Sequence, residues 1–269
     1  MLCANVSTAK FLEQSGLPCL YRNHDRPDVE KLRALRDFLK AFGLRLGGGN
    51  RPKTEDYAKL LSRFEGRKDQ HLLQMVLLRS MQQAVYSPDN VGHFGLAYEE
   101  YTHFTSPIRR YPDLLVHRAI KYALQQKSAK NYGYDHEQMM QLGSQCSMTE
   151  RRADLATRNA ADWLKCYYMQ DKLGETFEGV ISEVTGFGVF IELREVYVQG
   201  LLHITGLPND YYQYDAIHHC LRGKHSGRVY RLGDALRVKV VRVDLDERKI
   251  DFDLVPSENT PKPSLEEKD

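Results

Sequence analysis

The chain has 269 residues, enough for two domains, and its 42% of apolar residues can supply ordinary hydrophobic cores. A net charge of +2 conceals an uneven distribution: residues 1–173 carry +7, residues 174–256 carry −3 and residues 257–269 carry −2. The first part is therefore suited to a polyanion, whereas the second must bind a partner by means other than bulk charge.

Cysteine usage and hydropathy exclude several classes of protein. The cysteines are odd in number and form no C-x-x-C pair, which argues against a zinc site and against a disulfide framework: Cys3, Cys19, Cys146, Cys166 and Cys220. Lys10 and Glu13 lie in an amphipathic stretch that does not resemble a signal peptide, and no segment approaches the ~20 apolar residues of a membrane span. A cytoplasmic protein with reduced thiols and no membrane contact is expected.

The first part of the chain has the apolar period of helices. Helices are predicted over residues 1–15, 28–42, 54–64, 69–84, 113–126 and 135–172. One face of the second helix carries the apolar residues Val29, Leu32, Leu35, Leu39 and Phe42. In the last helix, over 135–172, Trp163 is expected to be a core residue. The glycines at 47–49 lack the Gly-Lys-Ser/Thr ending of a phosphate-binding loop.

The segment from His103 to Asp113 concentrates hydroxyl groups, two adjacent guanidiniums and two prolines. Ser106 followed by Pro107 is typical of a helix start, because serine caps free N–H groups and proline is tolerated at the first helical position. Pro112 would remove a hydrogen bond from the interior of such a helix, so a short turn followed by a main helix from about Asp113 is the alternative.

In both cases Arg109 and Arg110 lie near a helix N-terminus. Free N–H groups, the positive end of the helix dipole and forked guanidiniums together suit a phosphodiester. A solvated Arg-Arg pair at a helix start is the competing interpretation. Asp113 and His117 share a helical face with Arg118 beside them, and His117 either contacts the ligand or is a structural hydrogen-bonding residue.

This segment resembles the RNB catalytic domain of the ribonuclease II/ribonuclease R family, specifically its second half. The matching residues extend from His93-Phe94-Gly95-Leu96 through Tyr101 and His103 to His117-Arg118. The opening residues 1–5, and residues 151–154 leading to 162–164, also resemble the family. The resemblance implies processive 3′-to-5′ degradation of RNA to nucleoside 5′-monophosphates with Mg²⁺. It implies that Arg109 neutralises the scissile phosphate and that Arg110, His103, Thr105 and Ser106 hold the RNA backbone or the local loop.

The aspartate cluster that holds the family's metal, spaced like D-x₅-D-x-D-D, does not occur in this sequence. The pair Asp244 and Asp246 lies in the second domain, and the acidic residues at 266–269 lie in the tail, so neither is a credible substitute. No metal ligand is therefore assigned. The chain is expected to be a C-terminal portion of the enzyme, with the missing N-terminal half as a partner and with little activity alone.

From Gly174 the apolar period changes from helical to alternating. Strands are predicted over residues 177–184, 188–193, 199–204, 235–243 and 249–254, which suggests a five-stranded OB-type barrel and an α+β fold for the whole chain. The motif at 186–190, Gly200-Leu201-Leu202-His203 and Gly233-Asp234 resemble the S1 RNA-binding domain. The ligand-facing residues implied by that resemblance are Phe187, Phe190, His203, Asp244 and Arg248.

Phe187 and Phe190 flank a glycine-bearing turn, so at least one ring is expected to project as a stacking platform, although Phe190 could instead belong to the core. The tyrosine- and histidine-rich insertion from Asn209 to Tyr230 could extend that surface or cap the barrel's open end. The domains expected are 1–173, 174–256 and a disordered tail, 257–269.

Two functions fit these patterns. The first is the C-terminal part of an exoribonuclease that acts on single-stranded RNA and on 3′ overhangs of structured RNA. The second is a non-catalytic protein that binds single-stranded RNA through its S1 domain.

Overall fold

The computed structural model describes residues 1–67, 69–125, 131–215 and 218–255, which form two compact units. Unit 1 comprises Met1–Arg36, Arg45–Arg63 and Val76–Leu155, and unit 2 comprises Asp37–Leu44, Phe64–Met75 and Ala156–Asp269. The predicted tail lies outside the described residues. Within the described ranges, no helix has both the length and the apolar character that crossing a membrane requires. The cysteines are free thiols, and all but Cys3 are buried.

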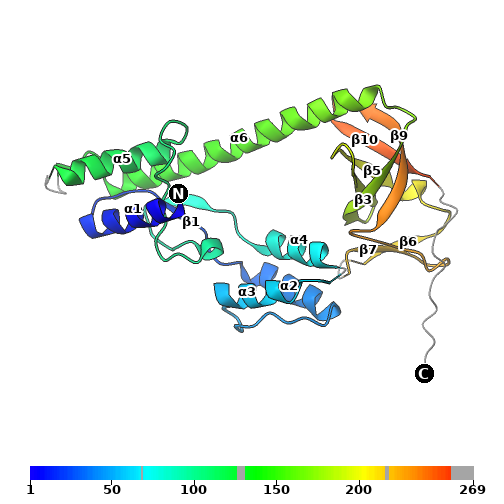
Figure 1. The fold of residues 1–269 in the computed structure, drawn as a ribbon, viewed down its shortest axis with the longest axis horizontal. Coiled ribbons are helices and arrows are strands. Elements are labelled where there is room, and N and C mark those ends of the chain that lie inside the picture. The colour runs from blue at the N-terminus through cyan, green and yellow to red at the C-terminus, as the bar shows by residue number, and fades with distance from the viewer. Residues whose placement is uncertain (68, 126–130, 216–217, 256–269) are drawn as a thin grey trace. The chain divides into compact units, whose positions relative to one another are not determined.

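The helices lie close to their predicted positions (Figure 1). Their bounds are α1 Leu2–Ser15, α2 Val29–Ala41, α3 Thr54–Ser62, α4 Gln70–Ser80, α5 Tyr111–Leu124 and α6 His136–Gln170, with a short 3₁₀ helix η1 at Phe94–Leu96. α2 buries Leu32, Leu35 and Leu39 as expected, but Val29 is 73% exposed because it begins the helix, ahead of the buried stripe.

The core of unit 1 lies where α1 and α5 pack together. Ala9 and Leu12 of α1 contact Val116 and Ala119 of α5, and Phe104 packs against the same cluster. A second cluster joins α5 to α6 through fully buried Met139 and its neighbours, Leu20, Tyr86, Leu115 and Cys146. The two clusters form the hydrophobic core on which the segment between residues 101 and 113 packs.

A two-stranded sheet was not predicted. β1 (Tyr21–Asn23) pairs antiparallel with β2 (Val85–Ser87), so that Arg22 lies opposite Tyr86. Three-residue strands are too short to show an alternating pattern.

The predicted barrel is present in unit 2. β3 (Thr176–Thr185), β4 (Gly188–Leu193), β5 (Gln199–His203), β9 (Ala235–Asp244) and β10 (Lys249–Leu254) close in the order β10-β5-β4-β3-β9. All neighbouring strands are antiparallel except β10 and β5, which are parallel. Alternate side chains such as Ile181, Val189, Leu202, Val238 and Phe252 fill the interior.

The insertion between β5 and β9 forms a second sheet. β6 (Tyr212–Asp215), β7 (Cys220–Gly223) and β8 (Val229–Arg231) pair antiparallel, after the 3₁₀ turn η3 at Ile204–Gly206. The carboxylate of Asp210 accepts hydrogen bonds from the Ser226 hydroxyl and from the backbone N–H groups of Ser226, His225 and Tyr211, and these donors hold the pKa of that carboxyl well below its usual range.

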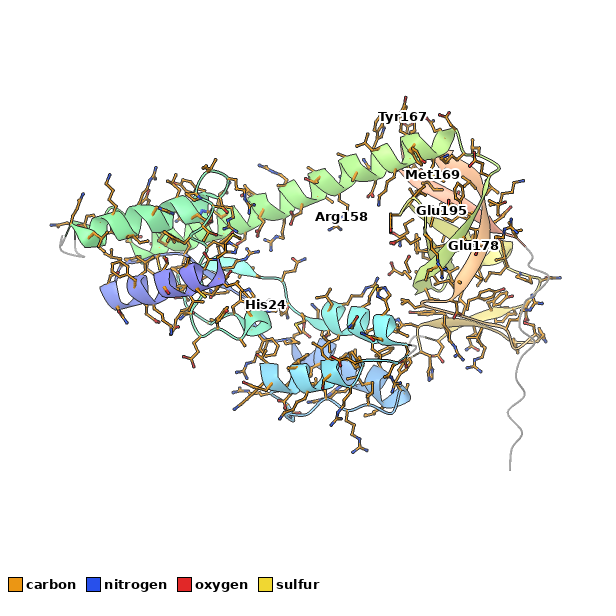
Figure 2. All side chains as sticks on the ribbon, viewed as in Figure 1. His24, Arg158, Tyr167, Met169, Glu178 and Glu195 are labelled. Atoms are coloured by element: carbon orange, nitrogen blue, oxygen red, sulfur yellow. The ribbon has the colours of Figure 1, made fainter. Side chains whose placement is uncertain are left out.

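The C-terminal end of α6 packs on the barrel through Cys166 and Met169, which are buried (Figure 2). The predicted core position of Trp163 is wrong. Trp163 is 44% exposed and its ring stacks on that of Tyr167 at 5.5 Å. With 3.6 residues per turn, the buried side of the helix contains residues 166 and 169, and Trp163 falls outside it.

Candidate nucleic-acid interface

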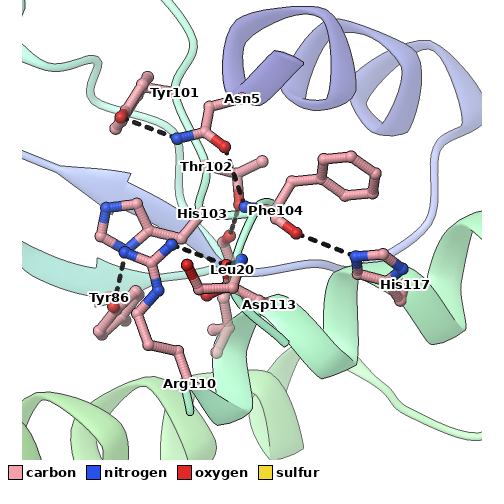
Figure 3. A network of polar contacts seen from close by, with 11 residues as sticks. Asn5, Leu20, Tyr86, Tyr101, Thr102, His103, Phe104, Arg110, Asp113 and His117 are labelled. Atoms are coloured by element: carbon pink, nitrogen blue, oxygen red, sulfur yellow. Dashed lines mark hydrogen bonds and ion pairs between the residues drawn. The ribbon is translucent and has the colours of Figure 1, made fainter. Parts of the chain in front are cut away.

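The segment between residues 101 and 110 is anchored to α1 by one asparagine (Figure 3). Buried Asn5 donates to the Tyr101 hydroxyl at 2.9 Å and accepts from the Phe104 backbone N–H at 3.1 Å. The Thr102 hydroxyl donates to the Leu20 carbonyl at 2.6 Å. Because each of these groups is buried and satisfied, the loop is held in one conformation.

His103 belongs to this scaffold. Its Nδ1 lies 2.8 Å from the Tyr86 hydroxyl, and burial, with the positive charges of Arg110 and Arg22, lowers its pKa to about 4. The ring is therefore neutral near pH 7. The Arg22 guanidinium lies 4.5 Å from the centre of the Tyr86 ring and forms an ion pair with Glu150 at 2.6 Å, so it supports the same site.

The chain at the arginine pair follows the second predicted alternative, a short turn followed by the main helix. Arg109 and Arg110 donate their backbone N–H groups to the Ser106 carbonyl, which makes a short turn, and α5 begins directly afterwards at Tyr111. Pro112 occupies the first turn of α5, where a helix has no partner for its N–H. The main helix therefore begins two residues before the predicted start.

The two arginines have different surroundings. The Arg110 guanidinium donates to the Asp113 carboxylate at 2.8 Å, and the same carboxylate oxygen accepts the Ser106 backbone N–H at 2.8 Å. Arg109 is exposed, and within the described chain it has no ion-pair partner. Arg109 is therefore free to meet an anion, whereas Arg110 is committed to the loop.

Three buried polar atoms around this turn have no hydrogen-bond partner among the described residues: Thr105 Oγ1, Arg110 Nε and Asp113 Oδ2. Such groups destabilise a fold unless a ligand or water satisfies them. They belong to the loop and helix start that carry Arg109, where a polar ligand would find partners.

Like Arg110 and Arg109, the neighbours His117 and Arg118 differ in that the first is held by the protein and the second is exposed. His117 Nε2 lies 2.9 Å from the Phe104 carbonyl and its ring stacks on Phe104 at 4.3 Å, so its structural interpretation fits this geometry. Arg118 is exposed on α5 and donates to the Tyr134 hydroxyl at 3.3 Å.

Asp113→Ala is expected to destabilise unit 1 by about 3–5 kcal/mol, because it leaves a partly buried guanidinium and a backbone N–H without an acceptor. Urea unfolding monitored by circular dichroism measures this loss. Asp89→Ala is the matched control: the Asp89 carboxylate lies 2.8 Å from His136 Nε2 in an exposed contact, and its loss should cost less than about 1 kcal/mol. Equal effects of the two substitutions would contradict the assignment of Asp113 as the anchor.

In unit 2, the aromatic residues predicted to stack on bases border a pocket of about 390 Å³. Phe187 is 50% exposed in the turn between β3 and β4, and its ring meets that of half-buried Phe190 edge-on at 6.2 Å. Arg248 is exposed and also lines the pocket, and no ion pair involves it within the described chain. The pocket thus combines two aromatic faces with a cation.

Gly200, which borders the pocket, is required by the packing of β5 against β10. A Cβ at Gly200 would lie 2.5 Å from the Phe252 ring and 2.8 Å from the Ile250 carbonyl, so a side chain cannot fit between β5 and β10. This close approach explains the glycine of the Gly200-Leu201-Leu202-His203 motif.

His203 and Asp244 do not line the pocket. His203 Nδ1 lies 2.8 Å from the Thr205 hydroxyl at the start of η3. Asp244 accepts from the Arg242 guanidinium at 2.7 Å and from the Glu247 backbone at 2.9 Å, which closes the turn between β9 and β10. The pocket instead includes residues of α6 that the motif comparison missed: Asp162, Lys165 and Cys166. They lie outside the alternating pattern of the barrel, and only the packing of α6 brings them to it.

A metal site is not visible in this arrangement. Across the part of the chain that the structure describes, no three His, Cys, Asp or Glu side chains come together as a metal site. The carboxylates of Asp113 and Asp244 are engaged by protein donors.

The exposed arginines on a helical scaffold, and an OB-type barrel with an aromatic pocket, define a nucleic-acid-binding class of protein. Residues 1–126 match the RNB domain, and residues 170–254 match the S1 RNA binding domain. The chain is similar to ribonuclease R of Escherichia coli strain K12, with 52% identity over 97% of the chain and 33% of the relative. It therefore spans about a third of the length of such relatives.

Solved structures agree with this similarity. The apo form of Mycoplasma genitalium RNase R superimposes with a TM-score of 0.83 at 29% identity, covering 95% of this chain and 40% of that one. The same protein in complex with ribose methylated single-stranded RNA gives a TM-score of 0.82 at 28% identity, with the same coverage. The fold is thus an RNB-type helical part followed by an S1 domain.

Proposed function

We propose that this chain is the C-terminal part of a 3′-to-5′ exoribonuclease of the ribonuclease R type, which hydrolyses RNA processively to nucleoside 5′-monophosphates. The observation that carries the proposal is the aromatic pocket of the S1 barrel, which exposed Phe187 and unpaired Arg248 both line. Its substrates are single-stranded RNA and the 3′ overhangs of structured RNA. The M. genitalium relative, solved with single-stranded RNA, supports this class of ligand.

Each predicted residue has a role in this proposal. Arg109 neutralises charge on the scissile phosphate, and Arg118 contacts the RNA backbone. Partly buried residues form or support the loop that presents Arg109: His103, Thr105, Ser106, Arg110 and His117. Phe187 and Phe190 stack on bases, Arg248 meets a phosphate, and His203 and Asp244 shape the neighbouring turns.

The cofactor proposed for the reaction is Mg²⁺, which would activate water and stabilise the leaving oxygen. The described residues do not fit such an ion, because no carboxylate cluster is assembled among them. We infer that the ligands come from the part of the relatives that this chain does not span, and that this part is its partner. Residues 1–173 would then be the second half of an RNB domain and 174–256 an S1 domain, in keeping with the matches at 1–126 and 170–254.

Phe187→Ala is expected to weaken binding of single-stranded RNA by about 1–3 kcal/mol, roughly 5- to 150-fold, because one stacking ring is lost. Fluorescence anisotropy of a labelled oligo(A) titrated with the 269-residue chain measures this change. Tyr167→Ala is the control, since Tyr167 is 59% exposed on α6 but does not line the pocket. Equal affinities of wild type and Phe187→Ala would refute RNA binding at the barrel.

A non-catalytic RNA-binding protein is the second candidate. The observation that favours it is the lack of an assembled carboxylate cluster in the described residues. RNA binding without hydrolysis, also in the presence of the missing part of the enzyme, would select this candidate.

A further inference from the structure

The pocket of the S1 barrel has a wall that does not belong to the barrel. Asp162, Lys165 and Cys166 come from the C-terminal end of α6, while Phe187, Phe190 and the strands β5 and β10 supply the remaining walls. A ligand stacked on Phe187 would therefore lie between the barrel and the helix.

The position of this helical wall is fixed. Cys166 and Met169 are 2% and 0% exposed against the barrel. Just beyond the helix, Gly174 donates to the Val240 carbonyl at 2.9 Å and Val240 donates to the Glu175 carbonyl at 3.0 Å. The end of α6 is thus tied to β9 by backbone hydrogen bonds, and Lys165, four residues before Met169, is carried at a set place beside the pocket.

Lys165 is half-buried, and its ammonium has no carboxylate partner within ion-pair distance among the described residues. Its side chain also borders a shallower hollow lined by Leu164, Tyr168, Val196 and Val198, so it is accessible from two hollows while its stem lies beside apolar side chains. Lys249, another cation of the pocket, is instead paired with Glu247 at 2.7 Å. Lys165 and Arg248 are therefore the two pocket cations available to an anion.

The charges around the pocket are mixed. The carboxylates of Asp162 and Asp251 line it together with the cations. Asp251 lies 3.8 Å from the Arg242 guanidinium, which offsets its charge. A purely apolar ligand would leave Lys165 and Arg248 unused, whereas a nucleotide offers a flat base to the phenylalanines and a phosphate to the two cations.

We propose that Lys165 of α6 is a further RNA-binding residue, which neutralises the phosphate of the nucleotide whose base stacks on Phe187. Phosphate neutralisation contributes equally to every sequence, so Lys165 sets affinity and not base preference. The inference rests on the proposed RNA binding by the barrel and adds to it a contact from outside the S1 domain's own strands.

Lys165→Gln removes the charge and keeps most of the stem. Removing one phosphate contact should reduce the slope of log affinity against log salt by about 0.7, which corresponds to about five-fold weaker binding at ~0.1 M salt. The measurement is anisotropy of fluorescein-labelled oligo(A) with the full chain between ~50 and ~200 mM salt, and Lys165→Arg should restore both values. Lys239→Gln is the matched control, because Lys239 is an exposed lysine of β9 that does not line the pocket.

The outcomes separate this inference from the proposed function. If Phe187→Ala weakens binding while Lys165→Gln changes neither affinity nor slope, the role of Lys165 is wrong and RNA binding by the barrel stands. If Lys239→Gln lowers the slope as much as Lys165→Gln, the effect is one of general charge and the inference is also overturned. If neither Phe187→Ala nor Lys165→Gln weakens binding, the proposed function fails as well.

Discussion

The 269-residue chain alone is expected to leave RNA intact in the presence of Mg²⁺. Hydrolysis assisted by this hard cation needs several oxygen ligands that converge on it, and imidazoles and guanidiniums do not replace them. The carboxylate next to the arginine pair is that of Asp113, and it already accepts hydrogen bonds from the Arg110 guanidinium and the Ser106 backbone N–H. The described residues contain no other group suited to the ion.

The test is to incubate the purified chain with a 5′-labelled oligo(A) and Mg²⁺ and to follow nucleotide-by-nucleotide shortening on a gel. A chimaera in which this chain replaces the matching third of E. coli ribonuclease R is the positive control, because the two segments are 52% identical. We expect shortening by the chimaera only. Adding the remaining part of the relative in trans should restore activity if the two pieces assemble.

Progressive shortening by the chain alone, after stringent removal of host nucleases, would show that a metal site has been overlooked. Failure of the chimaera to cleave RNA that it still binds would instead favour the non-catalytic candidate. The assay thus distinguishes the two functions considered for this chain.

The barrel was the most predictable part of the fold. Alternating apolar residues defined five strands, and β4 and β10 have the predicted bounds, because each strand has one face buried in a shared interior. The three strands β6–β8 were missed, since their pairing depends on Asp210 holding the turn at His225 and Ser226. That contact joins residues fifteen or more positions apart and leaves no local pattern.

The candidate site was predictable as a set of residues but not as a set of roles. The residue pattern alone placed Arg109 and Arg110 together at a phosphodiester, and only the family resemblance gave them different roles; in the structure buried Asp113 pairs with Arg110 alone. The His117 ring is likewise engaged within the protein, because its Nε2 hydrogen-bonds the Phe104 carbonyl. Which of two adjacent side chains is buried depends on the packing of α5 against α1, which is a tertiary property.

Arg109→Ala, made in the same chimaera, is expected to lower turnover by roughly 10²–10³-fold with little change in RNA affinity. This is the typical cost of removing one preorganised donor from a developing negative charge. Arg109 is the exposed, unpaired guanidinium above the turn at Ser106 in the described structure, whereas many other contacts would hold the ground-state RNA. Single-turnover rates and equilibrium binding, measured separately, give the two quantities.

Two further variants determine how Arg109 acts. Arg109→Lys should fail to restore the full rate if the phosphate needs a forked contact, because an ammonium presents a single point charge. Arg118→Ala is the matched control: it removes an exposed guanidinium of α5 and should weaken binding while single-turnover rates at saturating RNA stay near wild type. A large loss of affinity with an unchanged single-turnover rate for Arg109→Ala would make Arg109 an anchoring residue, and its proposed role at the scissile phosphate would be wrong.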